Sequence, residues 1–216
     1  LIPFGATDVG NVIAVTGGPT LRFPQDAISG AGPREGQTSG RVVILTGARL
    51  DRASAQQLGL AGAVVLVPLA AEDPTGLNHP LVRNLGFINA ERPAATLFVT
   101  PLGDAEWQRR AASVRTPRVS PAWHEEPPSG ARTVPVLLVR EASLRPVLQR
   151  VGVDLAALRQ AATGAATATP VDLTISITHL QRAASAVSAP NVVGIVEGSD
   201  PVLKHEYIAF SGHMDH

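Results

Sequence analysis

The sequence contains no cysteine and few aromatic residues, and these shortages narrow its possible functions. Without thiols, the chain can form no disulfide, no zinc ribbon and no cysteine nucleophile. Aromatic residues make up 4% and charged residues 17% of the 216 residues. Lys and Arg together number 18, as do Asp and Glu, so the formal net charge is +0. We therefore expect neither nucleic acid nor an anionic membrane surface as a partner.

The sequence also lacks long apolar runs. No stretch reaches the roughly 18 uninterrupted apolar residues of a membrane-spanning helix. The first residue is Leu1 rather than Met, and no basic leader segment precedes an apolar one. We expect that the chain starts inside a longer protein, and it neither shows nor excludes a signal peptide.

Glycine and proline are abundant, with 20 and 18 residues, and 44% of the residues are hydrophobic. This composition predicts a fold with a hydrophobic core, many turns and short strands, rather than a helix bundle. The expected fold class is mixed α/β, rich in strands and covered by short helices.

Short apolar runs bounded by Gly or Pro predict buried strands. These strands are expected at residues 11–16, 41–46, 63–68, 94–100 and 134–139. Helices are expected at residues 51–59 with Asp51 as N-cap, at 104–112, at 143–151 with Ser143 as N-cap, and from Asp154 to Gly164. The order strand, helix, strand within residues 41–68 predicts a βαβ unit with a right-handed crossover. Residues 24–40, 69–93 and 116–133 are interpreted as loops.

Composition shifts toward Ala and Thr at residues 161–170, which indicates a boundary between residues 1–168 and 169–216. Residues 171–178 alternate apolar and polar side chains, as in a half-exposed strand. Strands are also expected at residues 191–197 and 207–212, on either side of a turn at 198–201, and we expect them to pair as an antiparallel hairpin.

The main chemical candidate is His213-x-Asp215, which follows the last of these strands. Side chains two residues apart on a strand point to the same face. A carboxylate placed there can hold one imidazole nitrogen while the other nitrogen binds a metal. Taken alone, the pair is more often surface loop than metal site.

The surrounding residues give this pair its context. A short turn separates two segments of this region. The first segment is Asn191-Val192-Val193-Gly194-Ile195-Val196-Glu197-Gly198, and the second ends in Ala209-Phe210-Ser211-Gly212-His213-Met214-Asp215-His216. This pattern resembles the start of the catalytic domain of the M28 family of zinc metallopeptidases. More loosely, residues 40–68 and 134–152 resemble the protease-associated (PA) domain that many such enzymes carry as an insertion.

The resemblance implies a secreted or extracytoplasmic exopeptidase, of aminopeptidase type, that acts on peptide or protein substrates. His213 would be a zinc ligand, and Asp215 would be the catalytic-site carboxylate that orients His213. No role is assigned to His216, Met214 is at a variable position, and Gly212 stands where the family often has Ala. The family uses two Zn²⁺ ions, whose remaining ligands and general base lie further along the chain. The 216 residues alone are therefore expected to be inactive, because one His and one Asp cannot complete a zinc site.

Other candidates are weaker. The cluster His124-Glu125-Glu126 has no helical metal-ligand spacing, so it is interpreted as a solvated loop. His79 is interpreted as a loop residue, and His179 and His205 as exposed structural residues. The Gly pairs near residues 17 and 30 lack a phosphate-loop pattern, and Ser211 has no Gly-x-Ser-x-Gly elbow around it. The alternative function is a stand-alone, non-catalytic interaction module of PA type whose His-x-Asp pair is coincidental. The sequence gives neither the substrate preference nor the oligomeric state.

Overall fold

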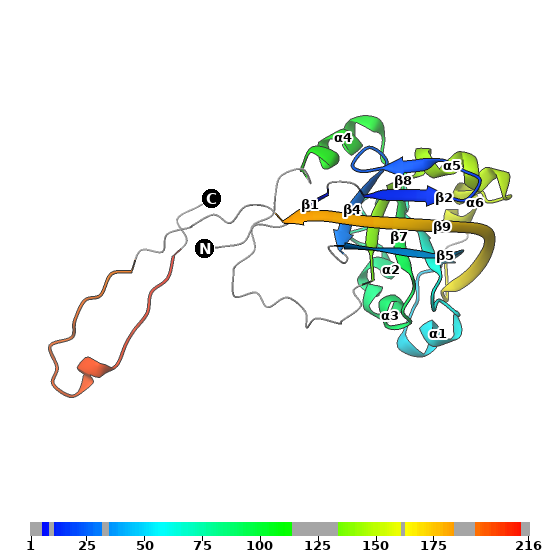
Figure 1. Cartoon of the computed structure of the whole chain (residues 1–216). Coiled ribbons are helices and arrows are strands. Elements are labelled where there is room, and N and C mark those ends of the chain that lie inside the picture. Colours follow the sequence, from blue (N-terminus) through cyan, green and yellow to red (C-terminus); the bar gives the residue numbers. More distant parts are fainter. Residues whose placement is uncertain are drawn as a thin grey trace.

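The computed structural model describes residues 6–8, 11–31, 35–113, 134–160, 163–183 and 193–212 (Figure 1). The described residues up to 183 form one body built on a nine-stranded sheet. Residues 193–212 form an extended arm that runs away from the body in Figure 1. We refer to these two parts as the body and the arm.

The sheet combines a parallel centre with antiparallel flanks. Its hydrogen-bonded order is β3-β2-β9-β5-β6-β7-β8-β4, and β1 pairs along β9. The contacts between β5, β6, β7 and β8 are parallel, and the remaining pairs are antiparallel. The strand bounds are β1 Ala6–Asp8, β2 Val12–Val15, β3 Thr20–Arg22, β4 Ala27–Ala31, β5 Glu35–Thr46, β6 Val64–Pro68, β7 Ala95–Thr100, β8 Val136–Arg140 and β9 Thr167–Ala183.

Short helices connect and cover the parallel strands. Their bounds are α1 Arg52–Gln57, α2 Pro80–Arg83, α3 Leu85–Ala90, α4 Asp104–Ser113, α5 Glu141–Arg150 and α6 Leu155–Gln160, with a 3-10 helix η1 at Leu203–His205. The expected mixed α/β class, with a large sheet and short helices, is confirmed. The strands expected within residues 11–16, 41–46, 63–68, 94–100 and 134–139 all correspond to strands of the sheet.

The first crossover follows the sequence prediction closely. β5 and β6 are parallel neighbours, and α1 lies between them in the chain. The Asp51 carboxylate accepts a hydrogen bond from Ser54 N at 2.8 Å, while Asp51 N donates to Ser54 Oγ at 3.0 Å. Asp154 caps α6 in a similar way and accepts from Ala156 N at 2.8 Å. Two of the three predicted N-caps, Asp51 and Asp154, are therefore confirmed.

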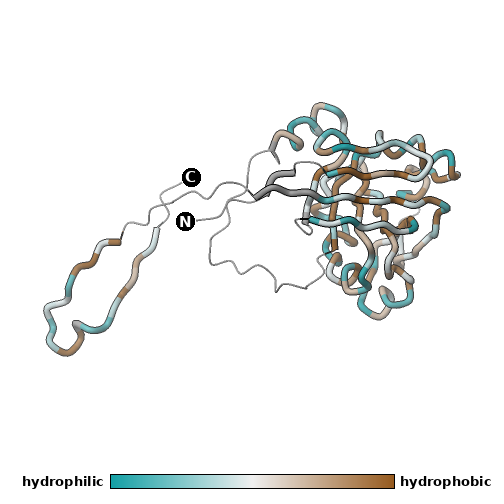
Figure 2. The backbone as a smooth tube through the Cα atoms, in the orientation of Figure 1, coloured by the Kyte–Doolittle hydropathy of each residue, from teal (hydrophilic) through white to brown (hydrophobic). Residues whose placement is uncertain are grey.

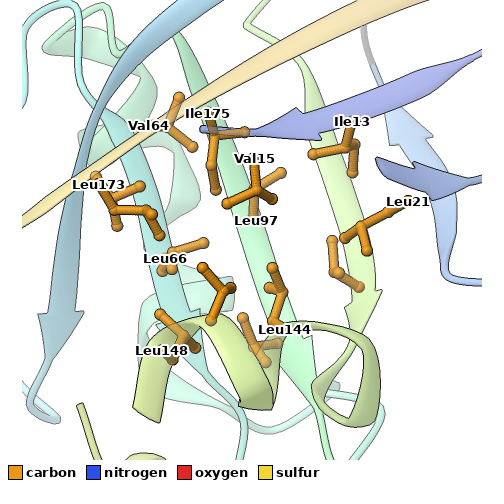
Figure 3. Packing of buried hydrophobic residues seen from close by; sticks show 14 of the residues in the cluster. Ile13, Val15, Leu21, Val64, Leu66, Leu97, Leu144, Leu148, Leu173 and Ile175 are labelled. Atoms are coloured by element: carbon orange, nitrogen blue, oxygen red, sulfur yellow. The ribbon is translucent and has the colours of Figure 1, made fainter. Parts of the chain in front are cut away.

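Two apolar clusters lie on the two faces of the parallel strands, because successive side chains of a strand alternate between faces. On β6, Val64 and Leu66 belong to one cluster, and Val65 and Val67 to the other. The first cluster includes Leu144 and Leu148 of α5, which Figure 3 labels, and Leu155 of α6. The second cluster contains residues of α1, α2 and α3: Ala55, Leu81 and Ile88. Helices thus cover both faces of the parallel part of the sheet.

Two of the three predicted loops contain regular structure. Residues 24–40 hold β4 and the first half of β5, because pairing with β8 and β9 supplies hydrogen bonds that local composition does not reveal. Residues 69–93 hold α2 and α3, and Pro80 stands in the first turn of α2, where its missing N–H costs nothing. The third predicted loop, 116–133, lies outside the described residues.

The helix expected to begin at Ser143 begins two residues earlier, at Glu141. Its N-cap residue is Arg140, which makes no side-chain capping bond. Ser143 Oγ instead donates to the Asp26 carboxylate at 2.7 Å, which links α5 to the turn before β4. Pro146 consequently lies inside α5 rather than in its first turn.

The long strand β9 crosses the predicted domain boundary at residue 168. Thr169 pairs with Ile44 and Val171 with Val42, both on β5, without a break in the strand. The alternation expected for residues 171–178 is confirmed, since Val171, Leu173, Ile175 and Ile177 are all buried. Residues up to 183 thus complete the sheet of the body.

The predicted hairpin of residues 191–197 and 207–212 is not formed in the described part of this segment. Residues 193–200 and 206–212 have no ladder partner, and the only regular element between them is η1. Asp200 accepts hydrogen bonds from Val202 N at 2.8 Å and Leu203 N at 3.0 Å, so the expected turn is present and slightly displaced. An isolated two-stranded ribbon is marginal in water, which is consistent with the unpaired geometry.

Candidate functional site

The two residues expected at the metal centre, His213 and Asp215, lie outside the described residues, as does His216. The described part of the arm ends at Gly212, and Ser211 and Gly212 are both exposed. Within the described ranges, no group of three or more His, Cys, Asp or Glu residues could hold a metal ion. The zinc ligand role of His213 and the orienting role of Asp215 therefore remain predictions.

The other histidines occupy different environments from those expected. His179 was expected to be exposed, but it is only 3% exposed. It lies on β9 with the same parity as Ile175 and Ile177, so the period of two places it on the buried face. His205 is exposed in η1, as expected. His124, Glu125 and Glu126 lie outside the described residues.

Polar side chains gather where the parallel strands end. Glu141 follows β8 directly and is 7% exposed, which is unusual for a carboxylate. Its Oε1 accepts from Arg145 Nη2 at 2.9 Å, and its Oε2 accepts from Arg159 Nη2. Arg159 Nε also donates to the Leu69 carbonyl at 2.5 Å, just after β6. This Glu141 cluster joins α5, α6 and two strand ends.

Electrostatics favour the ionised form of Glu141. Burial raises the pKa of its carboxyl, but the hydrogen bonds and positive charges of Arg159 and Arg145 together outweigh burial and lower it. Both carboxylate oxygens are already occupied by guanidinium groups, so Glu141 is poorly suited to act as a general base. The Glu141 cluster holds elements together rather than offering a reactive group.

A second group lies at the end of β8 and beside α4. Arg140 makes an ion pair with Asp104, and its guanidinium lies 5.7 Å from the centre of the Trp107 ring. Trp107 is fully buried, and its Nε1 donates to the Pro24 carbonyl at 3.1 Å. These contacts fasten α4 to the sheet, and they too are structural.

The loop of residues 69–79 lies at the same edge and carries His79 at its end. Pro74 O accepts from Thr100 Oγ1 at 2.6 Å, which fixes the loop to the end of β7. His79 is not a simple loop residue, because it is the N-cap of α2 and its Nδ1 accepts from Leu81 N at 3.3 Å. Burial lowers the pKa of His79, and the charge of Asp73 partly opposes this change. This loop combines a half-buried titratable group with an exposed apolar tip, Leu77.

Sequence reasoning missed the Glu141 cluster and the capping role of His79. The spacing of Glu141 and Arg145 is a helical ion-pair signal that could have been used. The sequence His79-Pro80 also has the form of an N-cap followed by proline at the first helical position. Arg159 could not have been found, because its contact with Glu141 depends on how α6 packs.

The comparisons with known proteins assign no family. No protein-family model and no curated protein matches the sequence. Among solved structures, the chain is similar to the crystal structure of the psychrophilic subtilisin-like protease Apa1 from the Antarctic psychrotroph Pseudoalteromonas sp. AS-11. The identity is 10% and the TM-score is 0.38, and the match covers 83% of this chain and 35% of the protease chain. This degree of likeness carries neither a family nor an activity over to the present chain.

None of the helices in the described ranges is both long and apolar enough to span a membrane.

Proposed function

We propose that this chain is part of a secreted zinc-dependent exopeptidase of the M28 type that acts on peptide or protein substrates. In this proposal, the body is a PA-type module that binds or admits peptide substrate, and the arm is the first strand pair of the catalytic domain. His213 would bind zinc, and Asp215 would accept a hydrogen bond from the other ring nitrogen of His213.

The observation that carries the proposal is the exposed apolar surface of the arm. Ten large hydrophobic residues are exposed in the described ranges; two are Leu77 and Phe87, and the other eight belong to the arm. Val196 is 99% exposed and Phe210 is 94% exposed. Figure 2 shows these apolar stretches on a segment that projects from the body. Soluble proteins rarely leave such a surface uncovered.

Burial of the apolar side chains of the arm would contribute a large stabilising free energy. Burying a large apolar side chain stabilises a fold by about 1.5 kcal/mol or more, so covering the eight side chains is worth on the order of 10 kcal/mol. The arm also has extended backbone without ladder partners at residues 193–200 and 206–212. Both features suit strands of a larger sheet, which is the place that the resemblance assigns to this segment.

The chemistry that the bound metal would supply is the activation of a water molecule for attack on the scissile carbonyl. The roles proposed for this chain are narrower. The His213 imidazole would be a neutral nitrogen ligand, and the Asp215 carboxylate would fix its tautomer and orientation. The ion-paired Glu141 of the body would take no part in the reaction.

The proposal is tested on the longest natural protein that contains this chain. Zinc content and hydrolysis of an aminoacyl-nitroanilide are measured for the wild type and for His213→Ala, Asp215→Asn and His205→Ala. We expect His213→Ala to bind no zinc and to have an activity about 1,000-fold lower than that of the wild type. We expect Asp215→Asn to bind the metal about 10-fold to 100-fold more weakly. His205→Ala is the matched control on the same arm and should behave like the wild type.

Two results would contradict the proposal. One is a longest natural protein that binds no zinc and hydrolyses no peptide substrate. The other is metal-dependent turnover by the isolated 216-residue chain at the rate of the longer protein. The first result would favour the alternative of a stand-alone interaction module. The body has its own sheet and hydrophobic core, which is consistent with that alternative.

A further inference from the structure

The 69–79 loop is held in one conformation by contacts at its start and at its middle. Leu69 N donates to Val99 O at 2.8 Å, and Pro74 O accepts from Thr100 Oγ1 at 2.6 Å. Inside the loop, the two oxygens of Asp73 accept from Thr75 Oγ1 at 3.3 Å and from Asn78 N at 2.8 Å. Leu77, between these bonds, is 73% exposed. The loop thus displays an apolar side chain on a fixed backbone at the carboxyl edge of the sheet.

His79 closes the loop by capping α2. A histidine nitrogen accepts a hydrogen bond only when it carries no proton, so the bond from Leu81 N to Nδ1 requires the neutral ring. Pro80 has no N–H, which makes the Leu81 amide the first donor of the helix. Leu81 is fully buried, so no water can replace the imidazole as acceptor without opening the turn.

Protonation of His79 would act against this arrangement in two ways. It would remove the acceptor from the Leu81 amide, and it would place a positive charge at the amino end of α2, where the backbone N–H groups already make the potential positive. Asp73 offers the protonated ring an alternative partner, because its negative charge acts on His79. The oxygens of Asp73 accept hydrogen bonds from Thr75 and Asn78, so an ion pair with His79 would compete with these bonds within the loop.

Few other charges act on this switch. The loop carries Glu72 in addition to Asp73, α2 carries Arg83, and Arg159 of α6 reaches the loop at Leu69. Arg83 Nη2 donates to Asn78 Oδ1 at 3.3 Å. The neighbouring elements β6, β7 and α3 contain no charged residue. Asp73 is thus the anion that can draw the protonated ring away from α2.

We propose that the 69–79 loop is a pH-operated clasp, in which neutral His79 locks the start of α2 and protonated His79 moves to Asp73 and releases it. The locked state presents Leu77 in a fixed position, and the released state does not. The proposal concerns the body alone and does not depend on the peptidase assignment.

The direction of the pH effect follows from proton linkage. The folded protein takes up a proton at His79 less readily than the unfolded chain, because protonation costs the cap bond. The stabilising contribution of the cap is therefore complete above the unfolded pKa of about 6.5 and is lost as the pH falls below it.

Amide hydrogen exchange of the full 216-residue chain tests the clasp between about pH 8 and about pH 5. The readout is the protection factor of the Leu81 amide, which corrects for the intrinsic effect of pH, with Leu66 of β6 as internal control. We expect Leu81 protection to fall about tenfold over this range while Leu66 protection stays constant. His79→Asn, which keeps a capping oxygen but cannot titrate, should show constant Leu81 protection; His79→Ser is a second variant of the same kind.

A third variant identifies the new partner of the ring. Asp73→Asn removes the attracting charge, so the transition in Leu81 protection should move to lower pH. The clasp is overturned if wild-type Leu81 protection does not change across the range, or if the change persists in His79→Asn and His79→Ser. An unshifted transition in Asp73→Asn would overturn the transfer of the ring to Asp73.

Discussion

At the scale of single residues, the Glu141 carboxylate shows how a buried charge is accommodated. It lies under the surface, yet each of its oxygens receives a guanidinium hydrogen bond. Removing one partner of such a group leaves the others buried and unpaired, which costs more than the contact itself contributes. Glu106 provides a comparison, because its ion pair with Arg109 lies on the surface, where water and salt weaken it.

We predict that Glu141→Gln lowers the free energy of unfolding by about 2 kcal/mol at neutral pH, as hydrogen bonds from charged donors weaken. The control Glu106→Gln should change it by less than about 0.5 kcal/mol. Because the folded-state pKa of Glu141 is lowered, its contribution is complete above the unfolded pKa of 4.5 and is lost as the pH falls through the folded value. Urea unfolding at a series of pH values should show the difference between wild type and Glu141→Gln shrinking in acid. Equal stability of the two proteins at neutral pH would contradict the prediction.

Residue-level prediction from sequence succeeded where the signal is local. Asp51 and Asp154 precede helices and cap them, as their positions indicate. It failed for His179, because its burial follows from the pairing of β9 with β5, a contact between distant parts of the chain. The proposed metal ligand His213 and its neighbour Asp215 rest on the sequence pattern alone.

At the scale of elements, several of the strands that were predicted correctly are buried on both faces. All residues of β6 and β7 are buried, and such continuous apolar runs are visible in the sequence. β4 and the first half of β5 are rich in Gly, Ser and other polar residues, and they are strands only because β8 and β9 pair with them. The short helices α2 and α3 were hidden by Pro80 and Gly86 in a segment rich in breakers.

One glycine on β5 makes a close approach between strands possible. A Cβ atom at Gly40 would lie 2.3 Å from the Gly62 carbonyl oxygen and 3.1 Å from Val64 N, both backbone atoms that cannot move aside easily. This contact lies next to the shift in register between Arg41 and Val42. The absence of a side chain at residue 40 therefore lets the loop before β6 close onto β5.

We predict that Gly40→Ala lowers the free energy of unfolding by about 2–3 kcal/mol, because the added methyl group forces the backbone of β5 away from Gly62. Gly86→Ala is the matched control in α3, where a Cβ would meet nothing within 4 Å. It should be neutral or stabilising by about 0.5–1 kcal/mol, because alanine favours a helix over glycine. Thermal unfolding of the two variants measures the contrast, and a Gly40→Ala protein as stable as Gly86→Ala would refute the steric argument.

At the scale of the whole molecule, the long strand β9 is part of the body, which therefore extends to residue 183. It pairs with β1, β2 and β5, and its buried residues include Ile175 and Ile177 in the main core. A cut at residue 168, where composition changes, would remove most of this strand. A cut after residue 183 would keep every described strand of the sheet and would remove the arm.

We predict that residues 1–183 unfold cooperatively with the same midpoint as the full chain, because the described arm adds no strand to the sheet. Residues 1–168 should lack cooperative unfolding and near-ultraviolet circular dichroism, since removing β9 exposes its own sheet neighbours and the core beneath them. The fragment of residues 1–183 should also aggregate less than the full chain, because it lacks the eight exposed apolar side chains of the arm. A stable, cooperative 1–168 fragment would contradict the assignment of β9 to the body.

The register of β1 on β9 sets Ala6 directly opposite Ala183. Residues opposite each other on antiparallel strands have Cα atoms only about 4.5–5.5 Å apart, so the polypeptide reaches and leaves the body at neighbouring points. Any segment joined before β1 and any segment joined after β9 would therefore connect to the body at one place on the sheet.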